Sequence, residues 1–501
     1  MSSLVELTFF SSVGWESWDV EARPTIPERM PVLVDDDLRF DDDSRGLRPS
    51  VAVNRWLREL PFSGAPSPGT WAVYARVLRD WMVFCALHGT GVFAGREDLK
   101  AVLGAYAVHR AEGPEQARFA ATTWNRHVSI LSCFYQWAVA EGYASGVPFS
   151  YAQAQVRYGD VRRDAQVNLA RRRVPKRHVT IRYLEADFAG LFIAALGGLG
   201  PDGMPDGGYR GRELARNSAV GKLALASGLR RQEFSYLLLY EIPPLPSSPG
   251  RLPVPFPVPA GVTKGRKYRT TWADHASLEA VHQYAGLDRA AAAGGSPWLP
   301  PPRWGEPLVV TEPDATGGRV NGRRVRWDKL GPGQRRRLIA PGGGSCLLAV
   351  RSDGGPFTAW ESVFTRASDR IQRRFEPRFP HVHPHRLRHS FALATLERLV
   401  SGYYAQAAGL VTATGSGHGP DAALALYLAR ADPMMVLRDL LGHSSVVTTE
   451  AYLRRLDMTR VYADAYERSG RDAGLAGEAA RREANEEFAD EDFPGTGGGR
   501  R

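Results

Sequence analysis

The sequence is poor in cysteine, and its three cysteines, Cys85, Cys133 and Cys346, lie far apart without the spacing of a metal site. A disulfide framework and a zinc knuckle are therefore both unexpected. The chain has no apolar run long enough to cross a membrane, and its N-terminus lacks the pattern of a secretory signal. It also has no GxxxxGK[ST] loop to support nucleotide hydrolysis. These absences predict a cytoplasmic protein that has no membrane partner and needs no metal or other cofactor.

Positive charge is what the chain has in excess. Its 501 residues include 64 Lys and Arg against 54 Asp and Glu, which gives a formal net charge of +10. A basic surface favours polyanions, of which nucleic acid is the commonest, although a merely soluble basic protein is the alternative. Only six of the basic residues are lysines, and two of these, Lys264 and Lys267, fall in one short segment.

The length indicates two or three domains. We expect an acidic N-terminal extension over 1–48, because Asp35–Asp37 and Asp41–Asp43 are acidic runs, and a helical DNA-binding domain over 49–155. Apolar side chains recur at helical spacing in that domain, at Trp71, Leu78, Trp81, Trp124, Val128 and Leu131. A larger domain over 181–470, with insertions near 298–356 and 401–430, precedes a disordered charged tail over 471–501.

A basic segment over 156–180 joins the two predicted domains. It carries Arg162, Arg163, Arg171, Arg172, Arg173, Lys176 and Arg177. Such a segment is either a solvated linker or a strap along DNA phosphates, where each contact adds salt-sensitive affinity. Its position between two folded regions favours the strap, so we expect these residues to bind DNA.

The first two candidate motifs of the larger domain are basic turns. In the first, Gly228 ends an apolar helix and Arg230 follows on the turn, where a rigid two-pronged donor can meet a phosphate. The second lies in residues 254–273, which read as a β-hairpin with Lys264 at its tip. A lysine there can donate a proton to a leaving oxygen, and Lys267 is the alternative donor and a DNA contact.

The third motif is a predicted helix start at Pro384. His385 and Arg388 then share one face at its amino end, where free N–H groups and the helix dipole attract an anion. The alternation of His381, His383 and His385 also suggests a metal site, but no cysteine or carboxylate joins them. We expect His389 to be a packed residue rather than a catalyst.

The fourth motif runs from Asp432 to Tyr452. Asp432 is expected to cap a helix that Pro433 opens and Gly442 ends, with His443 just beyond it. Residues nine apart on one helix would lie roughly 13 Å apart along its axis, so the break at Gly442 is what lets His443 and Tyr452 meet one phosphate. His418 precedes Tyr427 by the same spacing, but within a glycine-rich segment, and we reject that pair.

Taken in order, Arg230, Lys264, His385, Arg388, His443 and Tyr452 resemble the active-site set of the tyrosine recombinases, or phage integrases. The matching words are Ser-Gly-Leu-Arg-x-x-Glu, Thr-Lys-Gly, His-x-Leu-Arg-His-Ser-Phe-Ala and Leu-Gly-His-Ser-Ser. The resemblance implies a mainly α fold with a small antiparallel β-sheet in the catalytic domain. It also implies a two-domain DNA clamp, in which a helical core-binding domain and an α+β catalytic domain hold the duplex.

The same resemblance implies roles for these residues. Tyr452 would attack a phosphorus and form a 3′-phosphotyrosine, His385 would assist removal of its proton, and Lys264 would protonate the 5′ oxygen. Arg230, Arg388 and His443 would stabilise the charge that develops on the phosphate. The implied partners are double-stranded target sites, a homotetramer on two duplexes that exchanges Leu453–Ser469 between neighbours, and an accessory directionality factor.

The extra length favours an integrase or transposase of a mobile element, acting at the bacterial nucleoid, over a minimal chromosome resolver. Three alternatives stay open: a type IB topoisomerase-like relaxing enzyme, a catalytically silent DNA-binding protein with the same fold, and, more remotely, a metal-dependent nuclease.

Overall fold

The computed structural model describes residues 5–12, 26–38, 41–42, 46–65, 67–158, 161–174, 182–249, 253–412, 433–443, 449 and 452. The chain divides into two compact units. The N-terminal unit comprises residues 1–178 with 301–306, and the C-terminal unit comprises 179–300 with 307–501. Within the described part of the chain, no helix has the length and apolar character needed to span a membrane.

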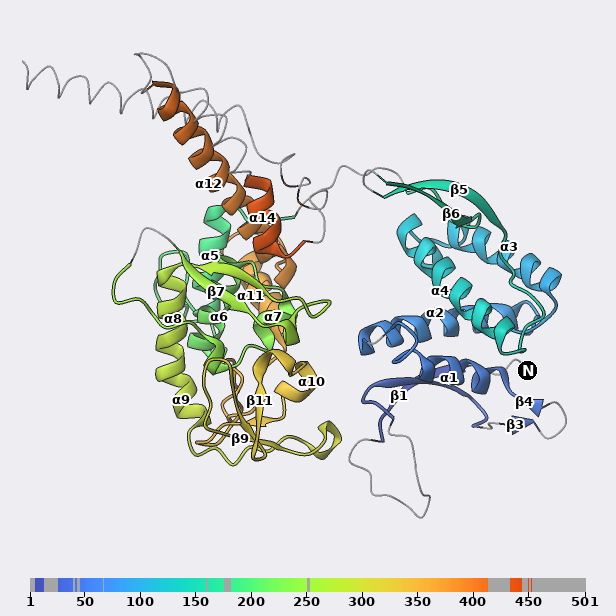
Figure 1. Ribbon diagram of the computed structural model, residues 1–501, viewed down its shortest axis with the longest axis horizontal. Helices are drawn as coiled ribbons and strands as arrows, with labels where there is room; N and C mark the ends of the chain where they lie inside the picture. The colour runs from blue at the N-terminus through green and yellow to red at the C-terminus, as the bar shows by residue number, and fades with distance from the viewer. Residues whose placement is uncertain are drawn as a thin grey trace, which may run out of the picture. The chain divides into compact units, whose positions relative to one another are not determined.

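The N-terminal unit is built on four helices, drawn in blue to cyan in Figure 1. They are α1 (Pro49–Glu59), α2 (Pro68–Leu87), α3 (Arg96–Glu112) and α4 (Ala121–Ala140), with the short 3-10 helix η1 (Glu115–Ala117) between the last two. Three antiparallel strand pairs accompany them: β1 (Val5–Phe10) with β2 (Met30–Asp35), β3 (Asp41–Asp42) with β4 (Gly46–Leu47), and β5 (Tyr151–Tyr158) with β6 (Val161–Asn168).

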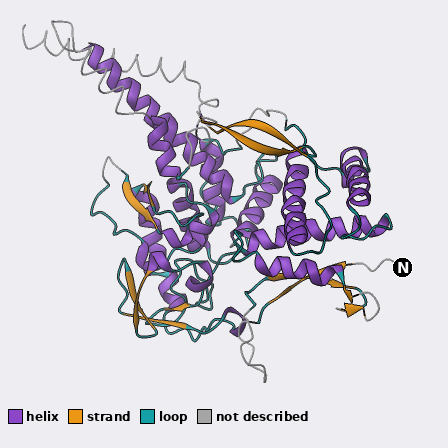
Figure 2. Cartoon of the chain, turned by 45° about the vertical axis from the view of Figure 1, so that its right-hand side comes forward, coloured by secondary structure: helices purple, strands orange, loops and turns teal. Residues whose placement is uncertain are grey.

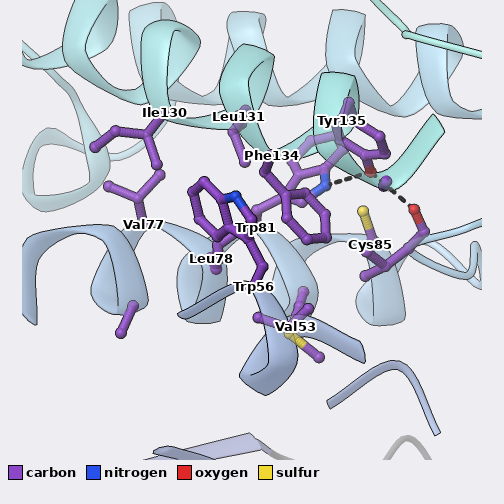
Figure 3. Packing of buried hydrophobic residues seen from close by; sticks show 14 of the residues in the cluster. Val53, Trp56, Val77, Leu78, Trp81, Cys85, Ile130, Leu131, Phe134 and Tyr135 are labelled. Atoms are coloured by element: carbon purple, nitrogen blue, oxygen red, sulfur yellow. Dashed lines mark hydrogen bonds between the residues drawn. The ribbon is translucent and has the colours of Figure 1, made fainter. Parts of the chain in front are cut away.

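Large aromatic side chains fill the core of this unit, as Figure 3 shows. Trp81 is fully buried, and its indole Nε1 donates a hydrogen bond of 2.8 Å to the hydroxyl of Tyr135. That hydroxyl donates in turn to the carbonyl of Val92 at 2.8 Å. Trp and Tyr are stable inside a core when their polar atoms find such partners. The apolar positions predicted from helical spacing are buried here, so that prediction is confirmed.

The C-terminal unit is mainly helical as well (Figure 2). Its helices are α5 (Ala186–Leu196), α6 (Leu214–Ser227), α7 (Arg231–Ser235), α8 (His275–Gly286), α9 (Asp288–Ala293), α10 (Pro332–Arg335), α11 (Trp360–Arg374), α12 (Pro384–Thr412) and α14 (Pro433–Leu441). Strands β7 (Val254–Val258) and β8 (Arg269–Ala273) pair antiparallel, which confirms the predicted hairpin. A mainly α fold with small, mostly antiparallel sheets, divided into two units, is the fold class that the sequence predicts.

The proline- and glycine-rich segment near 298–356 contains an ordered four-stranded sheet. Its strand order is β11 (Arg323–Arg326), β10 (Gly317–Val320), β9 (Leu308–Thr311) and β12 (Leu338–Ile339). A small core around Trp327 holds it, and the fully buried Arg335 donates to both carboxylate oxygens of Glu241 at 2.6 and 2.7 Å. This buried pair joins the sheet to the segment after α7, so the four-stranded sheet is part of the C-terminal unit, whereas residues 301–306 of the same segment belong to the N-terminal unit.

Candidate active site

Arg388 joins three segments of the C-terminal unit that are far apart in the sequence. It lies in the second turn of α12, is 2% exposed, and donates from Nη1 to the carbonyl of Gly228 at 2.7 Å and from Nη2 to the carbonyl of Leu441. Gly228 ends α6 in the left-handed region, with φ of 61°, and a Cβ there would lie 2.2 Å from the ring of Phe391. The turn therefore needs glycine, as its position in the sequence predicts.

Glu233 orients the neighbouring arginines. Its fully buried carboxylate accepts two hydrogen bonds of 2.6 Å from Arg269, one of 3.0 Å from Arg230 Nη1 and one of 2.7 Å from the backbone N–H of Arg230. Burial acts to raise the pKa of Glu233, but the hydrogen bonds from Arg269 outweigh it, and the pKa lies below its ordinary value. Arg269 also donates to the carbonyl of Leu440 at 3.1 Å, so β8 is tied to the end of α14.

The hydroxyl of Tyr452 contacts a histidine. Tyr452 is 3% exposed, and its oxygen lies 2.8 Å from Nδ1 of His389. Burial lowers the pKa of His389 to about 4, with the neighbouring His385 and the charge of Arg388 acting in the same direction. His389 is thus neutral at pH 7, and its Nδ1 is a proton acceptor in the tautomer that carries the ring proton on Nε2. Burial raises the pKa of Tyr452, while Arg388 and Arg230 oppose that rise.

His385 occupies a different place from the one that the resemblance implies. It is exposed, its ring meets that of His389 edge to face at 4.7 Å, and partial burial together with the charge of Arg388 lowers its pKa. The residue against the tyrosine hydroxyl is His389, which the sequence analysis took for a packing residue. The signal was present, because positions 385 and 389 are one turn apart and share a helix face.

His443 stands just beyond the left-handed Gly442, whose φ is 61°. Its Nδ1 lies 3.0 Å from the hydroxyl of Thr449, a fully buried residue that the sequence analysis did not single out. Its ring is nearly parallel to that of Tyr452, with 6.4 Å between the centroids. Burial lowers the pKa of His443 to about 4, and the positive Arg388 contributes to this. The break at Gly442 therefore brings the two side chains together.

The β7–β8 hairpin brings lysines towards the same place. Lys264 and Lys267 are exposed in the loop between the strands and line a hollow together with Arg230 and His443. Gly265 and Arg266 turn the loop with φ of 80° and 53°. Because both lysines line the hollow, the geometry does not distinguish between them as proton donors.

Positive charge in this cluster exceeds negative charge. Within the described part of the chain, Glu233 is the one carboxylate that bonds to Arg230 and Arg269, and Arg388 bonds to two backbone carbonyls and to no carboxylate. Burial, with the nearby Arg230, lowers the pKa of Arg388 to about 9. A buried cation without a counter-ion is costly, so the cluster favours an arriving anion. Among the described residues, His, Cys, Asp and Glu form no group of three that could hold a metal ion.

The predicted basic linker is partly a folded hairpin. Arg162 and Arg163 lie on β6, and Lys176 and Arg177 lie outside the described residues. The backbone of Arg172 is held by the side-chain amide of Asn125 at 2.8 and 2.9 Å. Its guanidinium lies 4.5 Å from the ring of Trp124 and donates to the carbonyls of Ala107 and Arg110, so it serves the N-terminal unit's own structure. Arg171 and Arg173 are exposed.

Other predicted features fall outside the described residues. They include the rejected pair His418 and Tyr427, the capping residue Asp432, the exchanged segment Leu453–Ser469 and most of the insertion near 401–430.

No protein-family model and no curated protein matches the chain. Its fold is similar to the XerH site-specific recombinase bound to difH substrate in a pre-cleavage complex, at 13% identity and a TM-score of 0.40, over 81% of each chain. The XerH post-cleavage complex with palindromic difH gives 14% identity and a TM-score of 0.42 over 83% of each chain. The Tn1549 transposon integrase in complex with circular intermediate DNA gives 14% and 0.40, over 80% of this chain and 94% of the integrase chain. The solved proteins to which this chain is similar are thus recombinases and an integrase, and at these identities the similarity concerns the fold alone.

Proposed function

We propose that this chain is a site-specific DNA recombinase that cuts and rejoins DNA through a covalent bond to Tyr452. One observation carries the proposal: a tyrosine hydroxyl lies 2.8 Å from a neutral histidine, next to a buried arginine that pairs with no carboxylate of the described residues. A nucleophile, its base and an anion-binding position therefore lie in one site. The ordered motifs that resemble the tyrosine recombinases support the same reading.

The first step transfers the proton of Tyr452 to Nδ1 of His389. The phenolate oxygen then attacks the phosphorus, the bond from phosphorus to the 5′ oxygen breaks, and a 3′-phosphotyrosine forms. The departing oxygen takes a proton from Lys264, or from Lys267, and leaves as a 5′-hydroxyl. Attack by the 5′-hydroxyl of a partner strand reverses these steps on a new junction. The phosphotyrosine keeps the bond energy, so the reaction needs no nucleotide.

The phosphate would be held by Arg388, Arg230 and His443. A guanidinium carries five N–H donors, and Arg388 directs only two hydrogen bonds to carbonyls. When the Thr449 hydroxyl donates to Nδ1 of His443, the other ring nitrogen carries the proton and can donate to a phosphate oxygen. Donors fixed before the charge develops are the most effective kind of transition-state stabilisation. His385 is then a neighbour of the proton acceptor rather than the acceptor.

We further propose that four copies act on two duplex target sites and exchange the segment Leu453–Ser469, as members of the resembled family do. The biological role that we favour is that of an integrase or transposase of a mobile element in the bacterial cytoplasm, assisted by a directionality factor.

The test uses a duplex that contains the target site, found by sequencing the flanks of the encoding element, with a nick next to the cleavage position. The wild-type protein should form a protein–DNA adduct that survives SDS, also in the presence of EDTA. Tyr452→Phe should abolish the adduct, and the matched control Tyr427→Phe should form it normally. Loss in the Tyr427 variant alone would overturn the assignment, and relaxed circles without strand exchange would favour a type IB topoisomerase-like activity.

A further inference from the structure

A second arginine-rich hollow lies in the C-terminal unit, away from Tyr452. The loop 208–213, the start of α6 and one side of α11 form it. Its rim carries five exposed arginines, namely Arg210, Arg212, Arg366, Arg373 and Arg374. Within the described part of the chain, Arg210, Arg212 and Arg366 pair with no carboxylate, so three guanidinium groups at the rim are available to a ligand.

Two further arginines are buried in the wall of the hollow. Arg216 is satisfied by the side chain of Asn217 and the carbonyl of Val350. Arg370 is only 7% exposed, and its Nε and Nη1 have no hydrogen-bond partner. The nearest carboxylate oxygen, on Asp206, is 3.6 Å from Nε, which is too long for a hydrogen bond. Buried donors are normally paired, so two open donors on one guanidinium indicate that an acceptor is missing.

The acidic residues at the hollow are fewer than its arginines and do not neutralise their positive charge. Glu213 lines it, and Asp206 is engaged by Arg374 at 2.5 Å. A concave surface of one sign concentrates its field and attracts ions of the opposite charge. Arginine also suits oxyanions in particular, because its fork of donors matches two oxygens of a phosphate or a carboxylate.

The hollow and the candidate active site lie at opposite ends of α6. Arg216 is in the first turn of this 14-residue helix, while Gly228, which accepts from Arg388, follows its last residue. At 1.5 Å per residue the two ends are roughly 20 Å apart. A phosphate bound in the hollow is therefore not the phosphate that Tyr452 attacks.

We propose that this hollow binds backbone phosphates of DNA at a distance from the cleavage position. DNA fits better than an acidic peptide, because its phosphates carry one charge per roughly 1.7 Å of duplex and can meet several rim arginines at once. The choice of DNA as the polyanion rests on the proposed function, whereas the existence of an anion site rests on the arginines alone.

The test measures binding of the full chain to a fluorescent 40-base-pair duplex of arbitrary sequence, at several salt concentrations. The double variant Arg210→Ala with Arg366→Ala should weaken binding roughly 10- to 100-fold at 0.1 M salt, and should reduce the slope of log K against log salt by about two. The matched control is Arg319→Ala with Arg323→Ala, on the separate sheet of β10 and β11, which removes the same charge. It should change affinity less than about threefold, since it leaves every phosphate contact of the hollow in place.

Equal effects of the two double variants would overturn the proposal. So would unchanged duplex binding combined with lost binding of a Glu-rich peptide, which would assign the hollow to an acidic partner. Because binding is measured without cleavage, a protein that never forms an adduct would refute the proposed function and leave this result intact. The single variant Arg366→Glu, at an exposed position of α11, tests the same contact if the double variant melts early.

Discussion

Each unit of this protein has a buried tyrosine whose hydroxyl lies against a histidine. Among the described residues, only the arginine beside the tyrosine of the N-terminal unit pairs with a carboxylate. In the N-terminal unit, the Tyr106 hydroxyl lies 3.1 Å from Nδ1 of His127 and donates to Asp80, which also pairs with Arg110. In the C-terminal unit, Tyr452 meets His389 at 2.8 Å, and the partners of the adjacent Arg388 among residues with a described placement are backbone carbonyls.

The two networks also differ in how their surroundings act on the pKa of the tyrosine. Burial and the negative Asp80 both raise the pKa of Tyr106, so its phenolate is strongly disfavoured. Burial raises the pKa of Tyr452 as well, but Arg388 and Arg230 oppose that rise, and no carboxylate accepts from its hydroxyl among the described residues. On the proposed function, the surroundings of Tyr452 are therefore the ones that favour nucleophilic attack.

The largest expected effect comes from removing that arginine. Arg388→Met should slow adduct formation about 10²- to 10³-fold, because a donor fixed near the scissile phosphate is lost. The melting temperature should change little, because the loss of the hydrogen bonds to the carbonyls of Gly228 and Leu441 offsets the removal of a buried charge. Adduct rates and thermal melts of the variant test both parts, and near-normal cleavage would make Arg388 a structural residue.

Removing the proton acceptor is expected to have the next largest effect. His389→Gln should slow adduct formation at pH 7 by about 10²-fold and leave duplex affinity unchanged, because an amide cannot take the tyrosine proton. His127→Gln, the equivalent change in the N-terminal unit, should leave the adduct rate as in the wild type. If His385→Gln slows adduct formation more than His389→Gln does, the proton acceptor is His385.

Breaking the network of Tyr106, His127, Asp80 and Arg110 in the N-terminal unit should lower stability without affecting adduct formation. Asp80→Asn removes the partner of Arg110 and should lower the free energy of unfolding by about 2 kcal/mol, less than for a fully buried pair because Asp80 is partly exposed. Urea unfolding measures this change. Adduct formation at saturating DNA should not change, and a defect there would show that the network also serves the reaction.

The smallest expected effect is the change that bound duplex makes to the pH dependence of stability. The pKa values of His127, His389 and His443 are each about 4, below the ordinary value of 6.5, so the unfolded chain binds more protons between these limits. Stability should be fully present above pH 6.5 and fall as the pH drops towards 4. Bound duplex should offset the loss in the C-terminal unit only, by about 2–4 °C in melting temperature. Hydrogen exchange resolved by unit measures this, and equal protection of both units would contradict it.

The parts of the site that could be predicted from sequence are local ones. Gly228 and Gly442 adopt the left-handed conformation expected at helix ends, Pro384 and Pro433 open helices, and residues 254–273 form a hairpin. Each depends on the conformational preferences of a few neighbouring residues. The helical spacing of the apolar residues in the N-terminal core could be predicted for the same reason.

Several contacts between distant residues were not predicted. Glu233 and Arg269 are 36 residues apart, and nothing in either motif shows that one carboxylate orients two arginines. Arg172, predicted to bind DNA, is instead held against α3 and α4 by residues 47 to 65 positions away. Such pairs form only when packing brings their elements together, so the pattern of a single segment does not reveal them.

The sequence by itself determined which residue types are available and which of them share a turn or a helix face, because those depend on backbone preferences over a few positions. It placed His385 and Arg388 on one face of α12. Only the tertiary structure decided that His389 meets Tyr452, that Arg388 pairs with no carboxylate of the described residues and that a second group of arginines gathers at the far end of α6. Those outcomes depend on how separate elements pack, and packing also sets which charges are neutralised.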